Sequence, residues 1–184
     1  MSVHNYSSDS VNVRKPVNVT LRAMEPEDLD TLYALENDRE IWNVGLTNVP
    51  YSRYVLHNYI AGTTNDIYAD CQMRLMVDDS NGVSVGIADI INFSPAHRRA
   101  EVGIVIKDSY RKRGLATAAL RQLVDYARTT LHLHQLYAIV PRENTVSARL
   151  FVRLGFGVTA TLPNWLFDGT KYHDVLVMQL FLAD

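Results

Sequence analysis

A short basic loop in the middle of the chain is the segment best suited to chemistry. Arg111, Lys112 and Arg113 stand directly before Gly114, and a second small residue, Ala116, follows two positions later. The three cationic side chains can neutralise phosphate charge, and the small residues let a ligand approach the backbone closely. At the start of a helix, a loop of this composition is typical of a phosphate or pyrophosphate site.

The elements around the loop have the order that such a site requires. An apolar strand is expected over 100–107, and apolar residues at helical spacing predict a long helix from Lys112 to Leu131. Helix N-termini carry unpaired N–H groups and the positive end of the helix dipole, so this loop could hold an anion. A buried strand over 135–140 follows, which requires a parallel crossover, and then a helix over 144–154.

The rest of the chain predicts further strands and two earlier helices. The turn signal Asp79-Ser80-Asn81-Gly82 indicates an antiparallel hairpin, with Cys71 inside its first strand. The acidic, proline-containing segment 25–28 opens one helix, and a second is predicted over 52–61. The expected strands are 17–22, 71–77, 83–93, 100–107, 135–140, 157–162 and 171–182. This order predicts an α+β fold, with a mixed sheet flanked by helices.

Composition narrows the classes of function. The 184 residues carry a formal net charge of −2 and one cysteine, so neither a polyanion-binding protein nor a disulfide framework is indicated. One domain is expected over 17–184, after a disordered polar tail over 1–16. No segment has the length and apolarity of a membrane span or the pattern of a secretory signal, so a cytoplasmic location is expected. The histidines show no metal-ligand spacing, so no metal is expected.

Three segments together resemble the signatures of the GNAT superfamily of N-acetyltransferases. They are the basic loop 111–116 between its strand and helix, the segment 144–156, and the run 171–175 that leads into the last strand. The resemblance covers residues 17 to 182 in matching order. It is nearest to bacterial spermidine/spermine and diamine N-acetyltransferases, and ribosomal-protein N-terminal acetyltransferases are also similar. The resemblance implies the GNAT-type acyl-CoA N-acyltransferase fold, mostly antiparallel with a central parallel β-α-β unit.

The resemblance also implies acetyl-CoA as cosubstrate and a set of residues that would bind it. The pantetheine arm would pair with the backbone of Ile104, Val105 and Ile106. The pyrophosphate would be wrapped by Arg111, Lys112, Arg113, Gly114, Leu115, Ala116 and Thr117. Asn144 and Ser147 would face the cofactor, with Phe151 beside it. A spacing of three residues does place Asn144 and Ser147 on one helix face, and Asn144 also suits a helix N-cap.

Acetyl transfer to an amine needs a neutral acceptor, a donor for the oxyanion and a proton for the departing thiolate. A backbone N–H near Val105 or Ile106 is the expected oxyanion donor. Two strand carboxylates are candidate bases, acting through water or by attracting a cationic amine: Glu101 and Asp89. Asp89 has the parity of the apolar residues Val85, Ile87, Ile91 and Phe93, so burial is expected to raise its pKa. For each acid the alternative is a strand-end carboxylate paired with Arg98 or Arg99.

The proton donor for the thiolate is where this chain departs from its relatives. Polyamine acetyltransferases carry a tyrosine at the position of Phe151, and phenylalanine cannot donate a proton. Ser147 is therefore the first candidate and Tyr137 the second. A further departure is Asn92, since the polyamine enzymes have an acidic residue there.

These observations predict transfer of acetyl from acetyl-CoA to a primary amine, with a polyamine or diamine favoured, in a direct ternary complex. The alternatives are an acetyltransferase acting on protein N-termini, as in the ribosomal-protein type, and a non-catalytic acyl-CoA sensor. Acceptor-binding residues are expected from Trp42, the loop 43–51 and Asn164-Trp165. No nucleic-acid or membrane partner is expected, and a homo-oligomer is left open.

Overall fold

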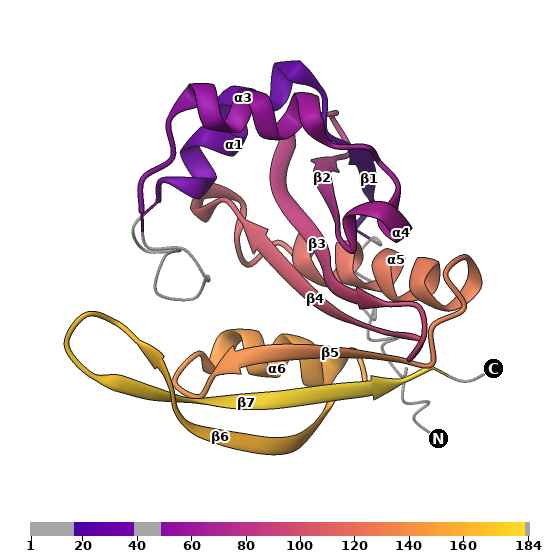
Figure 1. Cartoon of the computed structure of the whole chain (residues 1–184), viewed down its shortest axis with the longest axis vertical. Coiled ribbons are helices and arrows are strands. Elements are labelled where there is room, and N and C mark those ends of the chain that lie inside the picture. The colour runs from indigo at the N-terminus through magenta and orange to yellow at the C-terminus, as the bar shows by residue number, and fades with distance from the viewer. Residues whose placement is uncertain (1–16, 39–48, 183–184) are drawn as a thin grey trace, which may run out of the picture.

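A seven-stranded mixed sheet organises the computed structural model, which describes residues 17–38 and 49–182 (Figure 1). The strand order is β1-β2-β3-β4-β5-β7-β6, and only β4 and β5 are parallel. The strands are β1 (Val19–Ala23), β2 (Met73–Asp79), β3 (Ser84–Ser94), β4 (Arg99–Ile106), β5 (Gln135–Pro141), β6 (Gly157–Phe167) and β7 (Tyr172–Phe181). The predicted mixed sheet with a parallel β-α-β unit is confirmed. The expected tail 1–16 and Trp42 lie outside the described residues.

Helices cover the two faces of the sheet unequally. On one face, α5 (Leu115–Thr129) and α6 (Thr145–Arg153) contribute Leu120, Leu123 and Phe151 to the larger core. On the other face, α1 (Leu29–Glu36) and α3 (Arg53–Gly62) bury Leu32 and Leu56 in a smaller core. A short turn of helix η1 (Pro26–Asp28) precedes α1, and α4 (Ile67–Asp70) precedes β2. Figure 1 shows α1 and α3 over the half of the sheet that contains β2 and β3, and neither helix reaches β5 and β7.

The two parallel strands separate soon after they meet. Their ladder joins only Arg99, Ala100 and Glu101 to Gln135, Leu136 and Tyr137. Both strands continue beyond that point, β4 to Ile106 and β5 to Pro141, without pairing to each other. The divergence is visible in Figure 1 as the opening between the β4 and β5 arrows. Backbone groups on the inner edges of both strands are thereby left for other partners.

Left-handed backbone conformations correct two of the predicted boundaries. Lys112 has φ of 62° and Gly114 of 84°, so the long helix begins at Leu115 and not at Lys112. Cys71 has φ of 53° at the end of α4, where it is exposed, so its predicted place as a buried strand residue is wrong. The α4 turn itself was not predicted, because four residues are too few to show a helical period.

A buried ion network ties the N-terminal strand to the sheet. Arg22 on β1 donates to Asp28 Oδ1 and Oδ2 at 2.8 and 2.6 Å, and to Asp78 Oδ2 at 2.6 Å. The two aspartates are only 6% and 8% exposed, and Ser84 donates a further hydrogen bond to Asp78. The Arg22 guanidinium holds the pKa of Asp28 below its usual range. One guanidinium thus balances two buried carboxylates from η1 and β2.

Removing that guanidinium is expected to destabilise the fold strongly. In Arg22→Met, two carboxylates stay buried without their partner, and the free energy of unfolding should fall by about 3 kcal/mol, the low end for buried pairs. The low end applies because Arg22 is itself 33% exposed. Urea unfolding measures the change. Arg53→Met is the matched control, because both side chains of the Arg53–Asp30 pair are more than half exposed, and its midpoint should barely move.

A comparable loss of stability in the two variants would contradict this account, since it would show that the Arg22 network contributes no more than a surface pair.

Candidate active site

Two helix N-termini meet at one edge of the sheet, beside the opening between β4 and β5. α5 follows β4 and α6 follows β5, and the two strands are parallel. The first residues of both helices therefore lie at the carboxyl ends of these strands. The first backbone hydrogen bond of α5 runs from Ala118 N–H to Gly114 O, so the N–H groups of Leu115, Ala116 and Thr117 have no partner within the helix. This is the arrangement that favours an anion.

The basic loop is held in shape by its own side chains. Arg111 donates to the Ile106 carbonyl at 3.0 Å and pairs with Asp108 at 2.6 Å. Arg113 donates to the Ser109 carbonyl at 2.7 Å, and its guanidinium lies 5.0 Å from the centre of the Tyr110 ring. Both guanidinium groups therefore brace the loop in this structure. The backbone N–H groups and the exposed side chain of Lys112 are left for a phosphate.

The β4 backbone presents alternate residues to the opening. The Lys107 N–H donates to Val85 O on β3 at 2.9 Å. Because peptide groups alternate along a strand, Val105 also directs its groups to β3, whereas Ile104 and Ile106 direct theirs toward the opening. Of the three residues expected to pair with a ligand, the structure thus leaves Ile104 and Ile106. Of the two residues expected to offer an oxyanion donor, Val105 and Ile106, only Ile106 directs its N–H toward the opening.

Glu101 lies where the β4–β5 ladder ends. It pairs with Ile91 on β3 and Tyr137 on β5, and its Oε2 accepts a hydrogen bond from the Asn92 amide at 2.9 Å. Burial raises the pKa of Glu101, and the Asn92 amide and the Tyr137 hydroxyl lower it in part. Burial also raises the pKa of Tyr137, so the phenol keeps its proton. Glu101 is thus a carboxylate with neutral hydrogen-bonding partners at the closed end of the opening, where the sequence placed it.

Asp89 lies on the same face of the sheet but has a different environment from the predicted one. Arg74 Nε and Nη2 donate to its two carboxylate oxygens at 2.8 and 3.0 Å, and Arg74 also pairs with Glu36 of α1. The expected apolar row is also broken, because Val85 and Phe93 pack into the larger core on the opposite face. Two irregularities reverse the side-chain parity: β3 pairing with β4 shifts between Ile91 and Ser94, beside Phe93, and pairing with β2 shifts at Val77/Asp78, beside Val85. Asp89 is a partner of Arg74 and not the isolated buried acid expected from strand parity.

The three predicted site residues of α6 differ in whether their side chains are used in packing and capping or remain accessible to a ligand. Asn144 accepts a hydrogen bond from the Ser147 N–H at 3.0 Å, so the N-cap role of Asn144 is confirmed. Ser147 is half-buried, and within the described part of the chain nothing hydrogen-bonds its hydroxyl. Phe151 is 4% exposed and stacks edge-on against Phe156 at 5.1 Å, so it has little surface left for a ligand. Of the three, Ser147 is the one whose side chain is available to a ligand.

A histidine contact that the sequence did not reveal braces the loop before α6. His173 of β7 lies 2.6 Å from Asp168 through Nε2 and 3.3 Å from Glu143 through Nδ1. Glu143 directly precedes Asn144, and the neighbouring Arg142 pairs with Asp174 at 3.3 Å. Both carboxylates raise the pKa of His173. A protonated His173 therefore ties the β6–β7 hairpin to the start of α6. No spacing in the sequence shows the link to α6, because two segments that are distant in the chain, 142–143 and 168–174, supply the residues.

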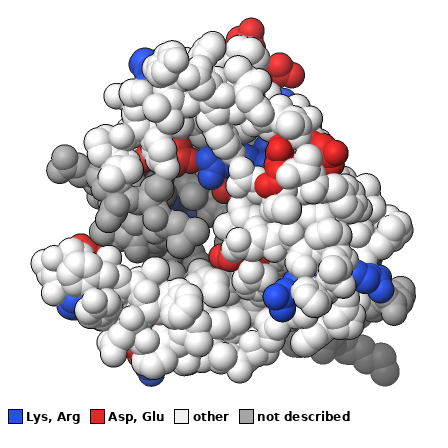
Figure 2. Space-filling view, in the orientation of Figure 1, with Lys and Arg blue, Asp and Glu red and all other residues white. Residues whose placement is uncertain are grey.

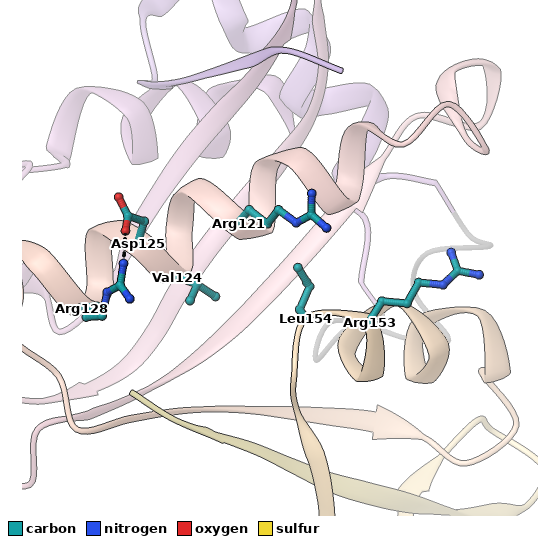
Figure 3. Close-up of a pocket in the computed structure, with 6 residues that line it drawn as sticks. All are labelled: Arg121, Val124, Asp125, Arg128, Arg153 and Leu154. Atoms are coloured by element: carbon teal, nitrogen blue, oxygen red, sulfur yellow. Dashed lines mark hydrogen bonds and ion pairs between the residues drawn. The ribbon is translucent and has the colours of Figure 1, made fainter. Parts of the chain in front are cut away.

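The outer surface shows two depressions of different kinds. In the orientation of Figure 1, the surface is hollowed between β4 and β5, and both basic and acidic side chains lie on the rim of the hollow (Figure 2). A separate pocket of about 230 Å³ lies between the middle of α5 and the end of α6 (Figure 3). Its lining is Arg121, Val124, Asp125, Arg128, Arg153 and Leu154, and Arg128 pairs with Asp125. This second pocket contains none of the predicted site residues.

Neither a metal cluster nor a membrane span is found in residues 17–38 and 49–182. No three or more His, Cys, Asp or Glu residues there are grouped to hold a metal ion. No helix in the same ranges has the length and apolarity needed to cross a bilayer.

The His173 contact should make stability depend on pH in a defined direction. The folded protein binds the His173 proton more tightly than the unfolded chain, whose histidine pKa is near 6.5. The stabilisation is thus present below that pH and lost as the pH rises through the higher folded-state pKa. The difference in Tm between the native protein and His173→Gln should be largest near pH 6 and should shrink toward pH 9. Scanning calorimetry across this range measures it.

Asp168→Asn provides the control for that experiment. When His173→Gln is added to Asp168→Asn, the resulting pH-dependent change in Tm should be smaller than when His173→Gln is added to the native protein. A difference that is the same at every pH, or that grows as the pH rises, would exclude the proposed ion contact.

Comparison with known proteins agrees with this geometry. The family model described as an acetyltransferase (GNAT) domain matches residues 18–157. The spermidine N(1)-acetyltransferase of Escherichia coli K12 is 31% identical over 168 residues, covering 89% of this chain and 86% of the relative. A putative ribosomal N-acetyltransferase of Bacillus subtilis is 26% identical over 170 residues, covering 89% and 91%.

Solved structures of one related enzyme show the same fold. The spermidine N-acetyltransferase of Vibrio cholerae in complex with CoA and spermine superposes with a TM-score of 0.80 at 29% identity, covering 89% of this chain and 95% of that one. A dodecameric structure of the same enzyme has a TM-score of 0.76 at 28% identity, covering 89% and 93%. The resemblance to bacterial spermidine enzymes and to the ribosomal type is confirmed. With matching family signatures, fold and coverage, the chain belongs to the GNAT family of acetyltransferases.

Proposed function

We propose that this protein transfers the acetyl group of acetyl-CoA to a primary amine of a polyamine, without a covalent acetyl-enzyme. The observation that carries the proposal is the opening between β4 and β5, which has helix N-termini at one end and Glu101 at the other. Similarity to the E. coli and V. cholerae spermidine enzymes supports the polyamine as acceptor. Similarity to the dodecameric enzyme supports a homo-oligomer.

The described residues fit the cosubstrate along its length. The N–H groups of residues 115–117 suit the pyrophosphate, and the inner edge of β4 at Ile104 and Ile106 suits the amide-bearing pantetheine arm. When bound, acetyl-CoA supplies the acetyl group as a thioester. A backbone N–H of Ile104 or Ile106 would then donate to the oxyanion that forms on the acetyl carbonyl.

Glu101 is the residue that would handle the acceptor. An amine with a pKa near 10 arrives as a cation and must lose a proton before it can attack. A carboxylate at the closed end of the opening attracts that cation and takes the proton directly or through water. The pKa of Glu101, raised by burial, makes its carboxylate a stronger base than an exposed glutamate.

Ser147 and Tyr137 remain the candidates to protonate the leaving thiolate, because Phe151 is buried and its side chain has no ionisable proton to donate. The Ser147 hydroxyl has no protein partner among the described residues, so it is open to a ligand. The Tyr137 hydroxyl interacts with Glu101 and Asn92, which places it beside the acceptor carboxylate instead. We favour Ser147 as the donor for that reason.

An amine panel tests the proposed reaction. Thiol release from acetyl-CoA should be fastest with spermidine, slower with putrescine and slowest with a short peptide bearing a free N-terminus. Glu101→Gln and Ser147→Ala should each lower turnover roughly tenfold or more, since each removes a group that moves a proton. Glu27→Gln, at an exposed glutamate of η1, is the control and should leave turnover unchanged.

Tight acetyl-CoA binding without thiol release from any amine would instead support the acyl-CoA sensor. A preference for the peptide would support the ribosomal-protein type.

A pair of glycine variants tests the cofactor end of the site. Gly114 and Gly82 both have left-handed backbones, with φ of 84° and 74°. Alanine at either position costs about 1–2 kcal/mol in backbone strain. A Cβ at Gly114 would also lie 3.3 Å from Val17, whereas one at Gly82 meets no neighbour, so Gly114→Ala should lose at least as much stability as Gly82→Ala. Only Gly114→Ala should also weaken CoA binding, by roughly tenfold or more, because it disturbs the loop that aligns the 115–117 N–H groups. Isothermal titration with CoA compares the two variants.

Equal CoA affinities in the two variants would remove the 111–117 loop from the cofactor site.

A further inference from the structure

Asn92 occupies an irregular position in the sheet. Ile91 pairs with Glu101 and Ser94 pairs with Arg99, so two β3 residues, Asn92 and Phe93, lie opposite the single β4 residue between them. This count defines a β-bulge, a feature that re-aims side chains. Asn92 has φ of 51°, in the left-handed region that asparagine tolerates better than most residues.

The bulge brings the Asn92 amide to the face that carries Glu101. In a regular strand, Asn92 would point away from the face shared by its neighbour Ile91 and by Glu101. The extra residue instead sends Phe93 into the larger core together with Ile90, and leaves Asn92 exposed at the surface. From there its Nδ2 donates to Glu101 Oε2 at 2.9 Å. The hydrogen bond is thus a product of backbone geometry and would be lost if the strand were regular.

The other neighbours of Glu101 show why the hydrogen bond from Asn92 is important for the orientation of its carboxylate. Tyr137 of β5 is its other hydrogen-bonding neighbour, and Gln179 of β7 pairs beside Tyr137. The charge of Arg99 of β4 acts on Tyr137, lowering the pKa of its phenol against the effect of burial. The other carboxylate on this sheet face, Asp89 of β3, is occupied by Arg74. Glu101 therefore depends on neutral groups for its orientation.

We infer that Asn92 is a positioning residue for Glu101, holding the carboxylate at the closed end of the β4–β5 opening in the orientation that meets the acceptor amine. The inference rests on the proposed function for its chemical meaning, and on the bulge and the hydrogen bond for its geometry. An amide at this position donates to the carboxylate without adding charge. An acid there would face Glu101 with a like charge at hydrogen-bond distance.

The amide also opposes the effect of burial on Glu101. Burial disfavours the charged carboxylate and raises its pKa, whereas a donated hydrogen bond stabilises that charge. Loss of the Asn92 amide should therefore raise the Glu101 pKa further. The acid limb of the pH profile of kcat/KM should move up with it, by about half to one pH unit, the size of one hydrogen bond.

Three variants separate this role from a purely structural one. Asn92→Gly removes the side-chain amide, and glycine adopts the left-handed backbone conformation without strain. Asn92→Asp keeps the shape and the backbone preference but replaces the donor with a second carboxyl group. Asn65→Gly is the matched control, since Asn65 has φ of 57° in the connection between α3 and α4, outside the Asn92–Glu101–Tyr137 cluster.

The Glu101 pKa is measured directly by NMR titration of the glutamate side-chain carbons, with Glu101→Gln used to assign the signal. The midpoint should rise by about half to one unit in Asn92→Gly. It should rise further in Asn92→Asp, because the two carboxyl groups would share a proton. Asn65→Gly should leave the midpoint where it is in the native protein. With spermidine as acceptor, the acid limb of kcat/KM should move in the same order.

An unchanged midpoint in both Asn92 variants would overturn the inference. If no amine is acetylated but the midpoint moves as expected, the proposed function fails while the positioning of Glu101 by Asn92 stands. If turnover falls in Asn92→Gly with the midpoint and acid limb unmoved, Asn92 has only a structural role and the inference is wrong.

Discussion

The early separation of β4 from β5 is the constraint on which the rest of the structure depends. Their parallel ladder ends at Glu101 and Tyr137, although both strands run on for several residues. Peptide groups of Ile104 and Ile106 consequently face an opening instead of a neighbouring strand. A ladder that continued to the strand ends would have used these groups internally. The binding surface for a long, amide-bearing ligand is therefore produced by backbone pairing and not by any single side chain.

The same pair of strands explains why two helix N-termini lie together. A parallel crossover places α5 after β4 and α6 after β5, so both helices begin at the same sheet edge. The left-handed Gly114 and the N-cap Asn144 shape these two starts. Side chains then hold them: Arg111 and Arg113, within the first loop, brace that loop, and His173 of β7 braces the second through Glu143. The anion-binding end is thus built from backbone and supported by charge.

The carboxylates of this part of the molecule differ in their partners. Those paired with an arginine have a structural role, whereas Glu101 is the proposed base. Asp89 and Glu36 share Arg74, and on β1 and β2 a single Arg22 serves Asp28 and Asp78. Such pairing compensates the charge locally, so these acids hold elements in place. Glu101 has an amide and a phenol as its hydrogen-bonding partners, so its charge is not cancelled by an ion pair. That difference supports Glu101, and not Asp89 on the same face, in the proposed role toward a cationic acceptor.

The sequence by itself determined the order of the elements, the parallel unit, the basic loop and the N-cap at Asn144, and it predicted Glu101 as one of two candidate bases. These follow from local periodicity, turn chemistry and motif spacing, which short stretches of chain carry alone. Three features were decided only by the tertiary structure. Arg74 forms an ion pair with Asp89, the backbone groups of Val105 bond to β3, and the Asn92 amide donates a hydrogen bond to Glu101. Each of these depends on strand register or on a bulge, and a one-residue shift in register turns a side chain to the opposite face of the sheet. The contact of His173 with Glu143 likewise joins segments that are distant in the chain, so no spacing within the sequence could have revealed it.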